Sequence, residues 1–164
     1  MQVGPPEVPN VTKAIQDVIP HNHCWGCGPL NPHGLQIKSF VEGGETVCSF
    51  TPSPAHMAGP THVLNGGIIA TVIDCHCVLT AIADAYRAAG RELGSEPLLW
   101  HVTASLKIDY LAPTPIAGPV ELRARVREAK GRKRVVECTL RAGEVDCARA
   151  EVVAVEVPAA WRGA

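Results

Sequence analysis

The chain has 164 residues, a length that suits one domain with a sizeable buried core. Its formal net charge is −1, so no bulk attraction to nucleic acid or to an anionic membrane surface is expected. The opening MQVGPPEVPN has no basic start followed by an apolar run, so it does not resemble a secretory signal. The lack of a recognisable secretory signal and the odd number of cysteines, seven, together favour reduced thiols in the cytoplasm over a disulfide framework.

The first part of the chain is expected to precede the main domain. Residues 1–10 are rich in proline and predict a poorly ordered tail, and residues 11–19 predict a short amphipathic helix that ends at Pro20. We therefore expect residues 1–20 to form a tail with a short helix, residues 21–158 a single domain, and residues 159–164 a C-terminal tail.

The next segment, HNHCWGCGPLNPHGL, is rich in turn-forming residues. Cys24 and Cys27, with His21 and His23, have the spacing of half a zinc site. A structural zinc needs four ligands, usually from two such pairs, and no second CxxC follows. A redox CxxC is also disfavoured, because no helix begins there to lower a thiol pKa. The sequence therefore predicts no metal site, and a compact loop with Trp25 packed against the domain.

Two strands and a long helix follow this loop. Residues 35–41 and 46–51 flank Glu-Gly-Gly-Glu, which predicts a hairpin with Gly-Gly at its turn. Residues 68–83 are apolar on every side apart from Thr71, Asp74, His76 and Thr80, and this length favours a buried helix over a strand. Asn65 is a good N-cap for that helix, and the pattern continues or restarts to about residue 89.

The last third of the chain is expected to consist of strands. Residues 99–111, 120–129, 134–141 and 146–157 alternate between apolar and polar side chains and predict a four-stranded meander. In the first of them, strict alternation groups Thr103 with the polar side chains and Val102 with the apolar ones. The element order predicts an α+β fold, an antiparallel sheet wrapped around one long buried helix.

An aspartate two turns into an apolar helix needs an explanation, because a buried carboxylate is unfavourable unless it is paired. Asp74 therefore has either a structural partner or a chemical role. Gly66 and Gly67 leave the N–H groups at the helix N-terminus bare of side chains, and such N–H groups bind anions. Held there, the oxyanion of an acyl-transfer reaction would be stabilised, while a nearby carboxylate activates water or attacks directly.

Four motifs, in order, resemble those of the PaaI-type acyl-CoA thioesterases of the hotdog fold, including the Them4-like branch. They are the loop CxxCGxxNPxGL at 24–35, GGIIATVID at 66–74, VTASLKIDYLAP at 102–113 and EAKGRKRVVEC at 128–138. The resemblance covers nearly the whole chain and implies the hotdog fold. It also implies hydrolysis of an acyl-CoA thioester to a free acid and CoA. No separate cofactor is implied, since coenzyme A is part of the substrate.

The resemblance also implies roles for individual residues. The Gly67 N–H would bind the thioester carbonyl, Asp74 would act as general base or nucleophile, and Thr103 would orient the water or the carboxylate. Thr103 reaches Asp74 only if its strand face borders the cleft or a β-bulge re-aims it. Asn65 stands where the family usually has His, which alters any proton transfer that this His performs. The residues expected to contact the substrate or its CoA phosphates are Gly66, His56, Gly131, Arg132 and Lys133.

The spacing of Gly67 and Asp74 predicts a site shared between two chains. Seven residues of α-helix span roughly 10 Å, whereas a general base must lie within about 3 Å of its proton. Two helices antiparallel across a two-fold axis would bring Asp74 of one chain to Gly67 of the other. A homodimer with shared active sites, or a dimer of such dimers, is therefore expected.

Two other functions are compatible with the sequence. A hotdog dehydratase or hydratase acts on the same thioesters, but its pattern of Asp followed five residues later by His is absent, because Leu79 stands there. A non-catalytic acyl-CoA-binding domain is the other alternative, with Asn65 as the mark of lost catalysis.

Overall fold

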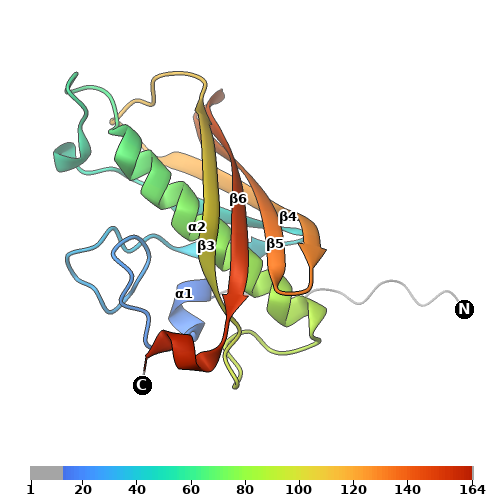
Figure 1. Ribbon diagram of the computed structural model, residues 1–164. Coiled ribbons are helices and arrows are strands. Elements are labelled where there is room, and N and C mark those ends of the chain that lie inside the picture. The colour runs from blue at the N-terminus through green and yellow to red at the C-terminus, as the bar shows by residue number, and fades with distance from the viewer. Residues whose placement is uncertain (1–12, 164) are drawn as a thin grey trace, which may run out of the picture.

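The structure is a computed structural model that describes residues 13–163. The predicted tail at residues 1–10 lies outside the described residues. The elements, in chain order, are α1 (Ile15–Val18), β1 (Ser39–Glu42), β2 (Glu45–Phe50), η1 (Pro54–His56), α2 (Gly66–Ala88), β3 (Trp100–Tyr110), β4 (Val120–Lys130), β5 (Lys133–Ala142), β6 (Val145–Val157) and η2 (Ala159–Arg162). Figure 1 shows α2 lying across one face of the strands.

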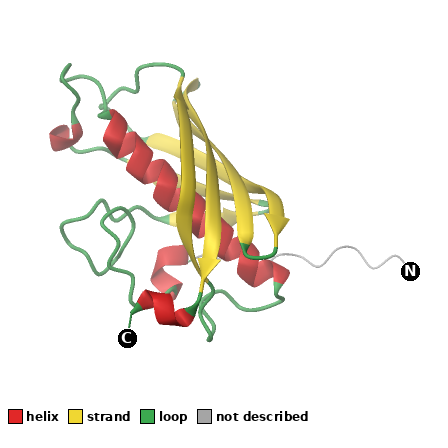
Figure 2. Ribbon diagram, in the orientation of Figure 1, coloured by secondary structure: helices red, strands yellow, loops and turns green. Residues whose placement is uncertain are grey.

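The six strands form one antiparallel sheet in the order β1-β2-β4-β5-β6-β3. This sheet around a single long helix is the hotdog arrangement that the sequence predicted (Figure 2). The predicted four-stranded meander is wrong in one respect: β3 pairs with β6, not with the next strand β4. The helix lies between β2 and β3 in the sequence, and after it the chain enters the sheet at the opposite edge as β3. The hairpin-linked strands β4, β5 and β6 then fill the space between.

The central helix begins directly after Asn65, as the predicted N-cap implies, and runs without a break to Ala88. By length and composition alone α2 could cross a membrane, but it packs along the sheet, and its buried side chains include Val72, Ile73 and Leu79. They meet Leu122, Leu140 and Val152 from the strands. Burying each such side chain contributes about 1.5–3 kcal/mol, so this helix–sheet contact is the main source of stability.

The segment before β1 departs from the predicted strand at residues 35–41. The Leu35 N–H donates to the Trp25 carbonyl oxygen at 2.8 Å, and the Ile37 N–H donates to that of Gly26 at 3.2 Å. The backbone there pairs with the cysteine loop, so β1 starts only at Ser39. Trp25 does not pack against the domain as predicted but is 48% exposed, because Gly26 and Cys27 face the interior instead.

The two ends of the described chain also differ from the sequence prediction. The N-terminal helix predicted over residues 11–19 is, within the described residues 13–19, the single turn α1. The expected C-terminal tail at residues 159–164 contains the short 3-10 helix η2. The predicted hairpin at Gly43 and Gly44 is confirmed, with Glu42 paired to Glu45 across the turn.

Candidate active site

Asp74 lies on a side of α2 that the described residues leave partly open. Gly67, Thr71, Asp74 and Val78 recur at helical spacing, and each is half-buried or exposed. The Thr103 hydroxyl on β3 donates to Asp74 Oδ1 at 2.5 Å. Burial raises the pKa of the Asp74 carboxyl, the bond from Thr103 opposes that rise, and the nearby Cys24 adds to it. The two residues predicted to act together are therefore in contact.

A β-bulge in β3 turns Thr103 toward the helix. Thr103 pairs with Ala154 and Ser105 pairs with Val153, which leaves Ala104 as an extra residue. Ala154 is fully buried, so its partner Thr103 shares the helix-facing side of the sheet. The predicted alternation is thus right only after the bulge, where Leu106, Ile108 and Tyr110 are the partners of the buried or half-buried Val152, Ala150 and Ala148.

The N-terminus of α2 is capped as the sequence predicted. Asn65 Oδ1 accepts hydrogen bonds from the Gly67 N–H at 2.8 Å and from the Ile68 N–H at 3.3 Å. This cap has a chemical consequence, because the Gly67 N–H is the group expected to bind the thioester carbonyl. In this conformation it already has an acceptor, so a substrate carbonyl has to displace Asn65 Oδ1 from it.

Tyr110 also contacts the start of α2, and sequence reasoning did not select it. Its hydroxyl donates to the Gly66 carbonyl oxygen at 2.7 Å, and its ring lies 3.6 Å from where a Cβ on Gly66 would stand. Tyr110 shares the helix-facing side with Thr103 only because the bulge changes the alternation between them. The presence of a polar aromatic residue near the end of a strand would not by itself have revealed this contact.

His56 is held by local contacts beside the helix start. Its Nδ1 accepts from the Ser53 N–H at 3.1 Å, and its ring stacks on Phe50 with the ring centres 5.8 Å apart. The His56 carbonyl oxygen accepts from the Asn65 N–H at 2.9 Å. These bonds connect the 53–56 turn to Asn65, the residue that caps α2. His56 therefore helps to position the cap beside the predicted oxyanion site.

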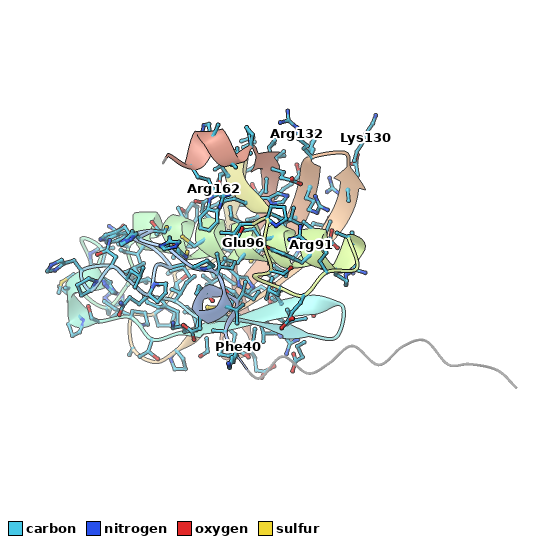
Figure 3. All side chains as sticks on the ribbon, turned by 90° about the horizontal axis from the view of Figure 1, so that it is seen from below. Phe40, Arg91, Glu96, Lys130, Arg132 and Arg162 are labelled. Carbon is cyan, nitrogen blue, oxygen red and sulfur yellow. The ribbon has the colours of Figure 1, made fainter. Side chains whose placement is uncertain are left out.

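The predicted CoA-binding residues lie at the tip of the β4–β5 hairpin. Gly131 has a φ of +56°, which makes the tight turn, and Arg132 and Lys133 are exposed. Figure 3 shows the side chain of Arg132 extending away from the helix. In the sheet register, Lys133 pairs with Val155 of β6, whereas Tyr110, which contacts the start of α2, pairs with Ala148 of β6. These two positions are seven residues apart along β6. One chain therefore does not bring the basic tip and the Gly67 N–H together.

A buried charged cluster lies at the C-terminal half of α2 and was not predicted. Arg134 Nε donates to Asp84 Oδ2 at 2.9 Å, and Arg134 Nη1 donates to His101 Nε2 at 3.3 Å. Burial and the Arg134 charge lower the pKa of His101 to about 4. Because these residues come from three separate segments, no local sequence pattern could have grouped them.

The three side chains that follow Asp74 in the helix, Cys75, His76 and Cys77, are buried. His76 Nδ1 lies 2.8 Å from Ser39 Oγ, and burial lowers the pKa of His76 to about 4. Cys77 is fully buried and Cys75 is 6% exposed. The Cys75 thiol is nonetheless more than a packing group, since it meets Cys24 and Cys27, and these three thiols are close enough together to share a metal ion.

A cavity of about 660 Å³ lies beyond the C-terminal half of α2, and Thr80, Asp84 and Arg87 are among the residues that line it. Asp74 is not one of them. The Asp74 carboxylate stands instead on the partly open side of the helix and is half-buried.

The fold is that of hotdog thioesterases. The sequence profile of the Thioesterase superfamily matches residues 61–148, and the chain belongs to this superfamily. A thioesterase superfamily protein from Shewanella loihica has 38% sequence identity and a TM-score of 0.65, with 84% of this chain and 96% of that one covered.

Curated relatives and a more distant structure are also similar. Acyl-coenzyme A thioesterase THEM4 from Xenopus laevis is 30% identical over 124 residues, which cover 74% of this chain and 50% of that protein. The chain thus spans about half the length of the curated relatives it matches. The Escherichia coli PaaI protein of the phenylacetic acid degradation operon has 16% sequence identity and a TM-score of 0.61. The structural match covers 76% of this chain and 81% of the PaaI chain, and it shows similarity in fold alone.

Proposed function

We propose that the protein hydrolyses acyl-CoA thioesters to a free acid and coenzyme A. The observation that carries the proposal is the Thr103–Asp74 hydrogen bond on the open side of α2, the helix whose N-terminus bears the Gly67 N–H. Membership of the thioesterase superfamily and the similarity to THEM4 support the substrate class.

In the proposed reaction, Asp74 takes a proton from a water molecule that attacks the thioester carbonyl, or Asp74 attacks that carbonyl itself and forms a mixed anhydride that water then hydrolyses. The C–S bond breaks, the CoA thiolate takes up a proton, and the acyl group leaves as a carboxylic acid. The Gly67 N–H stabilises the oxyanion at the carbonyl oxygen, and Thr103 fixes the rotamer of Asp74. Coenzyme A enters as part of the substrate, and the proposal includes no separate cofactor.

Binding of the carbonyl involves a change at Asn65. Asn65 Oδ1 and the thioester oxygen are both acceptors for the Gly67 N–H, so the substrate replaces an internal hydrogen bond with its own. This exchange leaves the helix N-terminus satisfied throughout. It also makes Asn65 a hydrogen-bonding residue in the proposal, with proton transfer assigned to Asp74.

We further propose a homodimer whose active sites are shared, with a dimer of dimers as its extension. Support comes from the edge strand β3, which is 11 residues long and has no partner on its outer side within residues 13–163. Long open edges are usually covered or paired. Support also comes from the open stripe of α2, on which Gly67 and Asp74 stand about 10 Å apart along the axis.

Arg132 and Lys133 of the exposed hairpin tip, with Gly131 at its turn, would then hold the CoA phosphates by charge-assisted hydrogen bonds. Gly66 and His56 would border the acyl end. We also propose a cytoplasmic location, and the odd number of cysteines, seven, supports it.

The test is thiol release from a panel of acyl-CoA thioesters, with Asp74→Asn as the matched variant. That substitution keeps the shape of the side chain and removes the charge, so kcat/KM should fall about 10²-fold or more. Binding of acyl-CoA without thiol release by the wild-type protein would indicate instead a binding domain, in which Asn65 keeps the Gly67 N–H. Consumption of an enoyl-CoA without free thiol would indicate a hydratase.

A further inference from the structure

Three cysteines from two distant segments converge beside α2. Cys24 and Cys27 come from the loop that precedes β1, and Cys75 comes from the helix, one residue after Asp74. Their Sγ atoms all lie within 4.8 Å of one another, and those of Cys24 and Cys75 are 3.6 Å apart. The helix therefore supplies the third thiol that the sequence pattern CxxC lacked.

The loop is built to hold its two thiols against the helix. Its turn is closed by the Gly28 N–H, which donates to the Cys24 carbonyl oxygen at 2.7 Å. A Cβ at Gly28 would stand 2.4 Å from the Cys24 nitrogen, and one at Gly26 would stand 2.3 Å from Cys75 Sγ. A side chain at either position would clash with these atoms, so both positions require glycine. At Gly26 the atom in the way is the Cys75 sulfur.

The Asn22 side chain helps to hold the two cysteines of the loop in place. Its amide nitrogen donates to Cys27 Sγ at 3.6 Å, and its Oδ1 accepts from the Cys24 N–H at 3.0 Å. The positions of the loop sulfur atoms are therefore fixed by contacts on the loop side as well as by the helix.

The separations suit one tetrahedral ion better than a disulfide. A zinc ion bonded to sulfur at about 2.3 Å places its sulfur ligands about 3.8 Å apart, close to the Cys24–Cys75 separation. A disulfide needs about 2.05 Å between two sulfur atoms and would leave the third thiol without a role. Thiolate ligands also select soft or borderline metals.

We propose that Cys24, Cys27 and Cys75 together bind one Zn²⁺ ion as thiolates. Three Zn–S bonds form, the thiol protons pass to solvent, and a water molecule takes the fourth position on the side where Cys24 is exposed. This proposal replaces the sequence-based expectation of no metal, which rested on the absence of a second CxxC. The ion would fasten the 22–37 loop to α2 and takes no part in the thioester step.

The experiment is a zinc titration of the metal-free full-length chain, kept reduced with a phosphine, with a competing zinc dye. We expect one equivalent of zinc per chain and a higher thermal midpoint with zinc than without. Cobalt(II) in place of zinc should give the sulfur-to-metal charge-transfer band and the visible d–d bands of a tetrahedral thiolate site. Cys24→Ser, Cys27→Ser and Cys75→Ser should each lose the binding.

Cys147→Ser is the matched control, because Cys147 is fully buried but its thiol lies against the carbonyl oxygens of Pro113 and Val145, away from the cluster. It should bind zinc as the wild type does. If the cluster variants do not fold, the cobalt spectrum of the wild-type protein still decides. The proposal is overturned if the wild type binds no stoichiometric zinc, if Cys75→Ser binds as much as Cys147→Ser, or if Cys24 and Cys75 form a disulfide in air that added zinc does not prevent.

Discussion

Thr103 on the edge strand donates its hydroxyl hydrogen bond to the carboxylate of Asp74 on the central helix. The two residues are 29 apart in the sequence, and their contact depends on the single extra residue in β3 that turns Thr103 inward. The bond stabilises the charged form of a carboxylate whose burial favours the neutral form. Among residues 13–163 the second carboxylate oxygen of Asp74 accepts no hydrogen bond, so it is available to a water molecule or a carbonyl carbon.

Thr103→Val keeps the shape of the side chain and removes the donor. We expect kcat/KM for thiol release to fall about tenfold, since one hydrogen bond to a charged group is worth roughly 1.5 kcal/mol or more. Thr103→Ser keeps the hydroxyl and should restore most of the activity. Equal activity of the Val and Ser variants would show that the bond does not position Asp74.

Asn65→Ala should lower the stability of the protein without lowering its activity. Loss of the cap lowers the free energy of unfolding by about 1 kcal/mol, and the same change leaves the Gly67 N–H free for a substrate. We therefore expect a lower thermal midpoint without a fall in kcat/KM. Asn65→Asp keeps the cap oxygen and adds a charge that competes with the carbonyl, so it should lower kcat/KM. A fall in kcat/KM for the Ala variant alone would contradict the proposed exchange.

Mixing two inactive variants tests the shared site. Asp74→Asn removes the carboxylate, and Gly67→Pro removes the N–H, so each variant alone should be inactive. If Asp74 of one chain meets Gly67 of its partner, each mixed dimer contains one intact site, and thiol release should return on mixing.

The control for this experiment is a mixture of each inactive variant with itself, after subunit exchange has been verified by mass difference. Folded variants that exchange subunits and recover no activity would show that the site lies within one chain.

His101 predicts a pH dependence of stability. Its pKa is about 4 in the folded protein against 6.5 in the unfolded chain, so between these values the unfolded state binds a proton that the folded state does not. The stability contribution is complete above pH 6.5 and decreases as the pH falls toward 4. His101→Gln keeps an acceptor for Arg134 and cannot be protonated. Its thermal midpoint should therefore fall less between pH 7 and pH 5 than that of the wild type, and an equal fall would contradict this assignment.

The sequence alone was sufficient for the features that depend on local chemistry. The apolar run after Asn65 predicted the central helix because strands rarely run that long, and the capping oxygen of Asn65 followed from its residue type. The Gly43–Gly44 turn marked the first hairpin for the same reason. The class of fold followed from the order of these elements.

The tertiary structure alone decided which residues meet across the sheet. The bulge at Ala104, the arrival of Cys75 beside Cys24 and the burial of Arg134 against Asp84 depend on strand register and helix placement. Register is set by the summed packing of many side chains over long sequence separations, and a shift of one residue reverses every side chain. Strand register therefore cannot be read from local sequence patterns. Thr103 could be named as a candidate from the sequence, but only the fold showed that it contacts Asp74.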